Sequence, residues 1–578
     1  MKIRIIGMFL LFEALFQFVA SCVALYYFYK WGEGDVVALT ISTIITSIFG
    51  FIFISAGRNN HKMPNREDIE NFDIKDSFFL VTFTWILFAL FGMLPFLFNG
   101  TVTNITDAFF EAMSGITTTG STVLNNIDDQ PHGILFWRSM MQWLGGLGII
   151  VLFLAVMPAL NRGSNKMMMF SAEMSGIGVK KLHPKMMMTA RKLLGIYIIL
   201  TILCGFAYWL GPMDTFDAIC HAMTTMSSGG FSTHQASIGY WNSPYLEYVA
   251  SFFMILSGIN FSLYYFLFTG DIKLFYQNEE LRWYIGMLVS FTIIIIGLFY
   301  VAPGVETVLS QQDTYPLTIE HRIRTSLFHV SSILTSTCFQ AENFDYDLWG
   351  SLFLIPTFIM MASGACAGST SGGIKIIREI ICIKSINNVF RQLIHPNALF
   401  SVRVSKEVVD EEKTWRVLNF LIIFLLLFLI GILLLLISGC SLEESIFNCV
   451  SGLGNSGPGL YTTGPSMSFS EMSVLGKWVM SSLMLIGRLD YDLREKEVVN
   501  ICDGRRFGYV CDMEIDTICG SICALIVPGE LKFLGFSRCN DYVIPWECVE
   551  QIGGDIILVR VVNLIPRERH GKGKRKKD

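Results

Sequence analysis

Charged residues are scarce in this chain of 578 residues. Asp, Glu, Lys and Arg make up 16% of it and apolar residues 52%, whereas an ordinary soluble domain carries about 25% charged residues. The composition excludes a soluble enzyme for most of the chain. It also excludes a porin-type barrel, because the apolar runs are far longer than its short alternating strands. Runs near the roughly 20 residues that cross a bilayer are 5–29, 36–56, 77–98, 133–160, 193–211, 245–269, 283–302 and 417–438.

Disulfide, metal and catalytic patterns are also lacking. The 14 cysteines have no framework spacing, so we interpret them as reduced thiols or small buried hydrophobes. The 9 histidines show no transition-metal spacing, and no nucleophile–base signature stands out. The sequence therefore predicts no enzyme, no cofactor and no nucleic-acid partner.

Basic residues gather in alternate loops, at 58–75, 162–192, 273–282 and 384–406. Lys and Arg favour the cytoplasmic side of a membrane. The basic first residues 1–4 could open a signal peptide, but the apolar run after them is too long and lacks a small-residue cleavage site, so we expect a membrane helix. Ten crossings of the cytoplasmic (inner) membrane would leave both termini in the cytoplasm.

Four segments rich in Gly, Ser and Thr recur between apolar helices. Each combines a short amphipathic helix with a stretch of small residues, so the predicted repeat is a helix, a re-entrant half-helix, a small-residue stretch and a second helix. The segments are 107–122, 217–233, 325–339 and 444–459, which we align on Gly120, Gly229, Cys338 and Gly457.

Irregular backbone at membrane depth is tolerated only inside protein or along a watery path. Four such stretches around one axis would form a ring of carbonyl oxygens, which can replace the hydration shell of a monovalent cation. The alternative is a generic transporter in which four Gly-rich segments merely connect helices.

A second unusual stretch, SGACAGSTSGGIK, lies at 363–375 within an expected helix at 349–381. Each glycine costs a helix about 1 kcal/mol relative to alanine, so we expect the helix to break into a mobile loop. The alternative is close helix packing through small residues.

Arg488 ends the short apolar run 472–487. An intramembrane charge is costly and usually marks a functional site. The alternative is an arginine that snorkels to the cytoplasmic interface.

Five motifs make residues 1–488 similar to the membrane subunit of the TrkH/KtrB potassium transporter family. They are TTTG (117–120), MSSGGFST (226–233), GSTSGGIK (368–375), GNSGPG (454–459) and LIGR (485–488). The resemblance implies an α-helical polytopic membrane protein with four pseudo-repeats around one pore, preceded by two extra helices. It implies a filter of Thr118, Thr119, Gly120, Ser228, Gly229, Gly230, Thr337, Cys338, Asn455, Ser456 and Gly457, and a gate of Gly368, Gly372, Gly373, Lys375 and Arg488.

The same resemblance implies partners and one departure. K⁺ would be the transported ion, and the protein would be a homodimer that contacts membrane lipid and a cytoplasmic TrkA/KtrA-type nucleotide-binding ring. Cys338 stands where the family usually has a filter glycine. Two interpretations stay open: a tolerated variant in one quadrant, or weakened discrimination between K⁺ and Na⁺.

The composition changes abruptly after Arg488. The stretches 493–516, 524–529 and 542–559 resemble the PRC-barrel domain of the YlmC/YmxH type, a small β-barrel that generally serves as an interaction module. The last membrane run is truncated, so an alternative function is a non-conducting membrane anchor or sensor that displays this barrel. The predicted units are two N-terminal helices (1–76), four pore repeats (77–192, 193–282, 283–411 and 412–488), the PRC-barrel-like domain (489–563) and a basic disordered tail (564–578).

Overall fold

The computed structural model divides the chain into two units, residues 1–492 and 493–578. The basic loops at 60–73 and 157–185 and the basic tail lie outside the described residues. The structure describes residues 2–59, 74–156, 186–268, 272–301, 318–341, 350–396, 400–405, 407–409, 411–465 and 467–489 of the first unit, and 497–500, 506–509, 512–515, 522–527, 531–532, 537–538, 542–552, 556–561 and 565–566 of the second.

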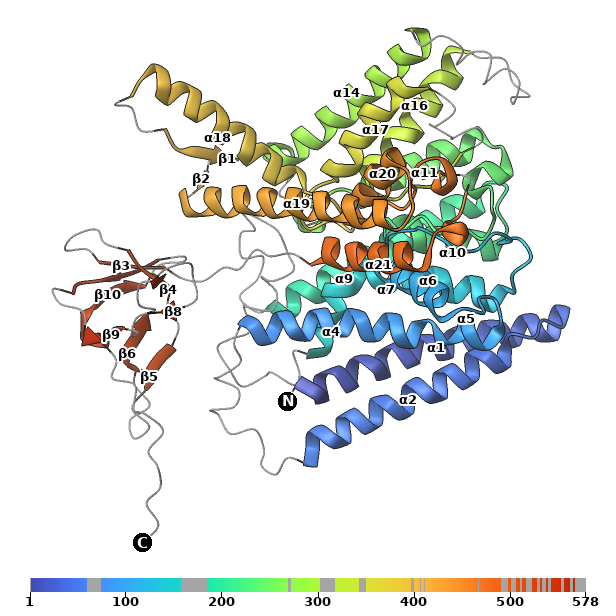
Figure 1. Ribbon diagram of the computed structural model, residues 1–578, viewed down its shortest axis with the longest axis horizontal. Helices are drawn as coiled ribbons and strands as arrows, with labels where there is room; N and C mark the ends of the chain where they lie inside the picture. The colour runs from blue at the N-terminus through green and yellow to red at the C-terminus, as the bar shows by residue number, and fades with distance from the viewer. Residues whose placement is uncertain are drawn as a thin grey trace. The chain divides into compact units, whose positions relative to one another are not determined.

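Long apolar helices dominate the first unit (Figure 1). Within the described residues, 6 helices are long and apolar enough to cross a membrane, which agrees with the predicted polytopic helical protein. They are α1 (Lys2–Trp31), α2 (Val36–Asn59), α4 (Ile74–Gly92) with its continuation α5 (Leu94–Asn99), α9 (Met186–Trp209), α14 (Glu279–Val301) and α19 (Glu411–Ile437). A further long helix is α7 (His132–Val156).

The N-terminal hairpin α1–α2 is tied to the start of α7. Its connecting loop carries Glu33 and Asp35, whose carboxylates accept the backbone N–H groups of His132 at 2.8 Å and of Ile134 at 3.2 Å. Carboxylates are favoured at a helix N-terminus because the first N–H groups lack partners within the helix. The hairpin is therefore fixed to the first repeat at this end.

Four of the shorter helices in the first unit, with 12 to 16 residues each, share one pattern. Each begins at an N-cap side chain (Asn104, Asp214, Thr318 and Ser441) that accepts a backbone N–H. Each is followed by buried small residues. These short helices are α6 (Ile105–Ile116), α10 (Thr215–Met226), α16 (Ile319–Leu334) and α20 (Leu442–Gly454).

Two apolar segments are broken. The expected break near 363–375 separates α17 (Ser351–Ser363) from α18 (Ile376–Ile394). The apolar run 245–269 has the length and composition of a span, as predicted, but it is bent: α11 (Pro244–Ser257) and α12 (Phe261–Phe268) meet at 94°. The Asn260 side chain accepts the Ser262 N–H at 2.9 Å and so caps the start of α12. The apolar composition of the run gave no sign of this break.

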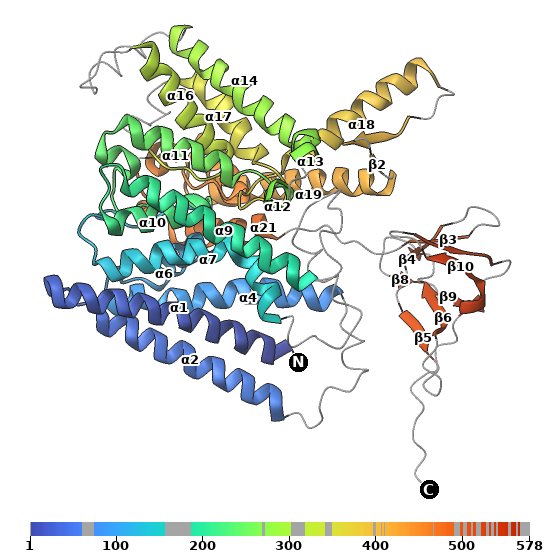
Figure 2. The same cartoon turned by 180° about the vertical axis from the view of Figure 1, so that it is seen from behind.

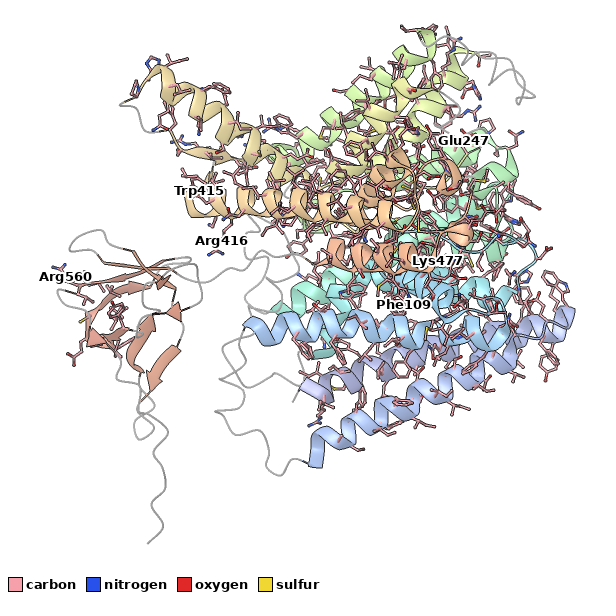
Figure 3. All side chains as sticks on the ribbon, viewed as in Figure 1. Phe109, Glu247, Trp415, Arg416, Lys477 and Arg560 are labelled. Carbon is pink, nitrogen blue, oxygen red and sulfur yellow. The ribbon has the colours of Figure 1, made fainter. Side chains whose placement is uncertain are left out.

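Buried ion pairs join the second helix of one repeat to the short helix of the next. Lys477, on α21 (Val474–Arg488), pairs with Asp107 on α6 at 2.6 Å. Glu247 on α11 pairs with Arg324 on α16. Figure 3 labels Lys477 and Glu247 inside the helical body. Each pair therefore holds another helix against one of the four short helices.

Three of the four short helices lie between the outer layers of the first unit, and the fourth, α16, lies at one edge. In Figures 1 and 2, α1 and α2 form one edge and α14, α16 and α17 the opposite edge, with α6, α10, α20 and α21 between them. Smaller elements are α13 (Ile272–Gln277), the 3₁₀ turns η1 (Ser237–Trp241), η2 (Tyr461–Thr463) and η3 (Phe469–Glu471), and the antiparallel hairpin β1 (Val402–Val404) and β2 (Glu407–Val409).

The second unit is built from short strands. One sheet has the order β10-β11-β3-β4 and the other β12-β9-β6-β5. Ile544, Val559 and Val561 form a buried core. The strands are β3 (Glu497–Asn500), β4 (Arg506–Tyr509), β5 (Asp512–Ile515), β6 (Ile522–Val527), β7 (Leu531–Lys532), β8 (Ser537–Arg538), β9 (Tyr542–Pro545), β10 (Val549–Ile552), β11 (Ile556–Val559) and β12 (Ile565–Pro566), with η4 at Trp546–Cys548.

Candidate functional site

Each of the four short helices ends in the same backbone turn. Two residues with positive φ flank one ordinary residue, and φ lies between 49° and 92° in all eight. Such angles are normal for glycine and rare for other residues, so this repeated conformation is a strong signal of a shared role. The pairs are Thr118 and Gly120, Ser228 and Gly230, Ser336 and Cys338, and Asn455 and Gly457.

The structure corrects the alignment of the second repeat by one residue. We aligned Gly229 with Gly120, but Gly230 has the matching positive φ. The Gly229 N–H bonds the Thr224 carbonyl at 2.9 Å, as the Thr119 N–H bonds that of Ser114. Gly229 therefore corresponds to Thr119, and two adjacent glycines left the sequence register open.

One residue of the third turn was missed by the sequence analysis. Ser336 has φ 55° and takes the place of Thr118. A signal existed, since Ser336 lies in the same Gly/Ser/Thr stretch as Thr337 and Cys338.

The turns meet one another through their carbonyl groups. A Cβ added to Gly120 would overlap the Gly229 carbonyl oxygen, and one added to Gly230 would overlap that of Thr337. A Cβ on Gly457 would lie 2.7 Å from the Thr119 oxygen. At these three contacts, the carbonyl of the middle residue of one turn lies against the last residue of the neighbouring turn. Only glycine fits at these three last positions.

The last residues of all four turns line a single pocket. Gly120, Gly230, Cys338 and Gly457 contribute to its wall, so segments far apart in the sequence converge on one point. We call the four turns around this pocket, with their backbone carbonyls, the ring, and the pocket above them its mouth. Such oxygens can coordinate a dehydrated monovalent cation.

Side chains behind the ring hold its backbone. Gln142, on α7, donates to the Gly229 carbonyl at 2.6 Å and accepts the Phe231 N–H at 2.9 Å. Asn455 donates to the Thr119 hydroxyl at 3.0 Å. The sequence analysis did not find Gln142, because a single glutamine inside an apolar run has no distinguishing spacing.

The broken segment between α17 and α18 lies against the helix side of the ring. The hydroxyl oxygens of Thr370 and Ser228 lie 2.6 Å apart, and the Gly372 N–H donates to the Ser336 hydroxyl at 2.8 Å. A Cβ on Gly372 would overlap the Gly454 carbonyl. The loop therefore contacts the first residues of two turns and the end of a third short helix.

The same loop is anchored at the bend between α11 and α12. The Cys366 N–H donates to the Gly258 carbonyl at 3.1 Å, and the Phe261 N–H donates to that of Gly368 at 3.0 Å. A straight α11–α12 helix would bond these backbone groups internally. The unexpected bend thus has a structural consequence: it offers free backbone groups to the loop.

Arg488, at the end of α21, reaches into the same region. Its guanidinium donates to the Thr370 carbonyl at 3.1 Å and to the Gly145 carbonyl at 3.0 Å. Lys375, at the end of the loop, has φ 77° and bonds the Ser371 carbonyl. Arg488 is therefore directed inward to the loop, which favours the first of its two predicted roles.

Comparison with known proteins identifies the family. The model of the TrkH family, described as a cation transport protein, matches residues 43–491, and the PRC-barrel domain model matches residues 487–564. The chain belongs to the TrkH family. The predicted resemblance is thereby confirmed, as is the C-terminal PRC-barrel domain, and the family is one of transporters rather than enzymes.

Relatives and a solved structure agree with this assignment. The chain is 36% identical over 432 residues to the Trk system potassium uptake protein TrkH of Escherichia coli K12, covering 74% of this chain and 86% of the relative. For the TrkH protein of Halomonas elongata the identity is 32% over 493 residues, covering 85% and 96%. The crystal structure of the potassium transporter TrkH from Vibrio parahaemolyticus matches with a TM-score of 0.70 at 29% identity, covering 85% of this chain and 97% of that one.

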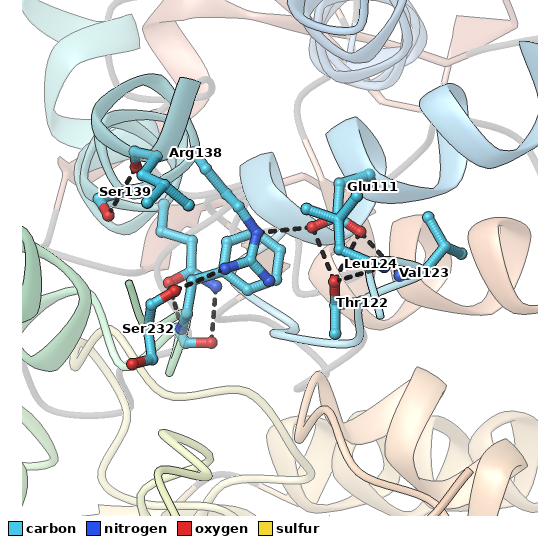
Figure 4. A network of polar contacts seen from close by, with 11 residues as sticks. Glu111, Thr122, Val123, Leu124, Arg138, Ser139 and Ser232 are labelled. Atoms are coloured by element: carbon cyan, nitrogen blue, oxygen red, sulfur yellow. Dashed lines mark hydrogen bonds and ion pairs between the residues drawn. The ribbon is translucent and has the colours of Figure 1, made fainter. Parts of the chain in front are cut away.

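A buried ion pair supports the mouth of the ring in this TrkH-family chain (Figure 4). Arg138 donates to Glu111 at 2.6 Å and to the Ser232 carbonyl at 2.8 Å. Glu111 also accepts the Thr122 hydroxyl at 3.0 Å and the Val123 N–H at 2.9 Å. A buried pair with these hydrogen bonds fixes the segments that follow the first and second turns. Neither charge was predicted as a site residue.

A histidine on the same side lies between two carboxylates. The His234 ring is 2.6 Å from Asp128 and 3.2 Å from Asp217, and it stacks on Tyr240. Burial alone would lower the pKa of His234, but the hydrogen bonds to Asp217 and Asp128 outweigh burial and raise it. The pocket mouth therefore contains a histidine whose pKa lies above its usual value.

Proposed function

We propose that this chain mediates K⁺ uptake across the cytoplasmic membrane, with the four turns as its selectivity filter. The observation that carries the proposal is the convergence of four identical turns on one pocket. Relatives named as potassium uptake proteins support the choice of ion. K⁺ moves inward down its electrochemical gradient and is the substrate; no cofactor is required.

The filter works through main-chain oxygens. The middle residues of the turns are Thr119, Gly229, Thr337 and Ser456, and three of their carbonyls meet a neighbouring turn closely. Because the short helices are capped and the ring is held from behind, the oxygens stay in place as the ion sheds water. Selectivity then follows from how well the ring replaces the hydration shell.

The gate is the loop between α17 and α18 together with Arg488. The loop closes the helix side of the filter through Thr370 and Gly372. The guanidinium of Arg488 adds a positive charge beside it, and a positive charge in a low-dielectric path repels K⁺. Ions pass when the loop and Arg488 shift together.

The predicted assembly is a homodimer in the inner membrane, with both termini cytoplasmic and a TrkA/KtrA-type ring as partner. One helix offers a surface for such contacts: α18 carries an exposed apolar stripe, which exceeds the scattered apolar residues of an ordinary surface. The stripe consists of Ile383, Ile386, Val389, Phe390, Leu393 and Ile394.

One observation favours the alternative of a non-conducting anchor that displays the PRC barrel. The last helix, α21, has only 15 residues, fewer than the roughly 20 that cross a bilayer, and the PRC-barrel match begins at residue 487. Arg488 nevertheless keeps its bonds to Thr370 and Gly145, which supports transport as the leading function.

The test is ⁸⁶Rb⁺ uptake in cells that lack their own K⁺ uptake systems. Wild type should take up the ion, and Gly120→Ser should abolish uptake or broaden it to Na⁺, because the added atoms meet the Gly229 carbonyl. Gly286→Ser is the matched control, since a Cβ there meets nothing within 4 Å. Folded wild-type protein that takes up no ⁸⁶Rb⁺ would refute the proposal and leave the anchor function.

A further inference from the structure

Two consecutive glutamates open the helix α14. Glu279 and Glu280 form part of its first turn, after Asn278, whose side chain accepts the Leu281 N–H at 2.8 Å. They serve different partners: Glu280 is turned into the protein and is only 6% exposed, whereas Glu279 meets a hairpin nearer the surface. A buried glutamate is expensive unless its oxygens are occupied.

Glu280 holds the gating loop by its backbone. Its carboxylate accepts the Ala367 N–H at 2.6 Å. Ala367 belongs to the first half of the loop. The carboxylate therefore holds the segment that contacts the filter at this residue.

Glu279 holds the hairpin of β1 and β2. Its carboxylate accepts the Ser405 N–H at 2.9 Å, and its own N–H donates to the Ser405 hydroxyl at 3.1 Å. Lys384, on α18, bonds both Glu279 and the Arg403 carbonyl. The hairpin packs beside α18, and both extend away from the helical body (Figure 2).

The two contacts share one rigid support. Adjacent residues in a helical turn move together, because the backbone hydrogen bonds of the helix fix their relative positions. A displacement of the hairpin that pulls on Glu279 therefore also displaces the Glu280 carboxylate. The loop would then lose its anchor at Ala367.

We propose that Glu280 is a positioning residue that holds the gating loop against the filter, and that Glu279 couples the hairpin of residues 402–409 to it. The proposal deepens the proposed function, since the coupled loop is the proposed gate. A partner that binds the hairpin or α18 would thereby open or close the pathway. The partner acts on the hairpin, the first turn of α14 transmits the displacement, and the loop responds to it.

A native cysteine reports the loop position directly. Cys366 lies in the loop and is fully buried, as is Cys204 on α9 in the helical core. The full-length protein is treated with N-ethylmaleimide in membranes, and modification of each cysteine is followed by peptide mass spectrometry. Reaction at Cys366 alone reports release of the loop, and Cys204 reports loss of the whole fold.

Glu280→Ala removes the acceptor of the buried Ala367 N–H, so Cys366 should react about tenfold faster. Glu280→Gln keeps one acceptor oxygen and should give a smaller increase. Glu279→Gln leaves the loop contacts intact, yet coupling predicts an increase of about twofold to fivefold at Cys366. The matched control is Glu247→Gln, which alters an equally buried glutamate in the ion pair with Arg324. This variant should leave Cys366 unreactive.

Unchanged Cys366 reactivity in both Glu280 variants would overturn the positioning role, and unchanged reactivity in Glu279→Gln would overturn the coupling. Cys204 reacting as fast as Cys366 would also overturn it, because the carboxylate would then hold the whole fold. The labelling needs no transport. Selective labelling at Cys366 in a chain without ⁸⁶Rb⁺ uptake would therefore refute the proposed function while the coupling stands.

Discussion

The hydroxyl oxygens of Ser228 and Thr370 lie 2.6 Å apart, although the residues belong to different repeats. Ser228 is the first residue of the second turn, with φ 54°. The Thr370 hydroxyl also donates to the Met226 carbonyl at 3.1 Å, and the Thr370 carbonyl accepts a hydrogen bond from Arg488. One threonine thus joins the filter, the end of a short helix and the arginine, and movement of the loop must break several of these bonds.

Thr370→Val removes that hydroxyl while keeping the shape of the side chain. The closed loop should lose about 1 kcal/mol, the usual value of a hydrogen bond, so ⁸⁶Rb⁺ leak into proteoliposomes should rise about fivefold. Thr292→Val is the control, since Thr292 bonds only a carbonyl of its own helix at 2.7 Å. Equal leak from the two variants would contradict a role of Thr370 in closure.

Arg488 combines a charge with two hydrogen bonds, and two variants separate these contributions. Arg488→Gln removes the charge, whereas Arg488→Lys keeps it but loses the guanidinium geometry that reaches both Thr370 and Gly145. If the charge forms the barrier, ⁸⁶Rb⁺ flux should rise about tenfold or more in the glutamine variant and only slightly in the lysine variant. Similar flux in both variants would instead assign closure to the hydrogen bonds.

The sequence predicts the helical scaffold well, because transmembrane helices and small-residue stretches have a direct compositional signal. The break before Lys375 follows from four glycines in one run. The bend at Gly258 does not follow, since a single glycine and Asn260 hardly change an apolar run. Single polar residues such as Gln142 and Glu280 show their role only when the fold brings their partners together.

His234 predicts a pH dependence on the pocket side of the filter. Its pKa is raised by Asp217 and Asp128 against the effect of burial. Protonated His234 therefore stabilises the folded state fully below the ordinary histidine pKa of about 6.5, and this contribution is lost as the pH rises through the raised value. The Tm of wild type should exceed that of His234→Gln at pH 6, and the difference should shrink by pH 9. A difference that grows with pH would contradict this linkage.

Cys338 provides the sharpest test of the ring. It has φ 56° and carries a Cβ where the other three turns have glycine. A left-handed non-glycine residue costs roughly 1–2 kcal/mol of folding free energy. Replacement by glycine recovers only part of this cost, because glycine has more conformational freedom in the unfolded chain. Cys338→Gly should therefore raise the Tm in detergent and increase the ratio of Rb⁺ to Na⁺ flux, since all four turns would then end in glycine. Cys338→Ala removes the thiol but keeps the Cβ and should change neither quantity, so an equal gain in both variants would assign the effect to the thiol rather than to the backbone.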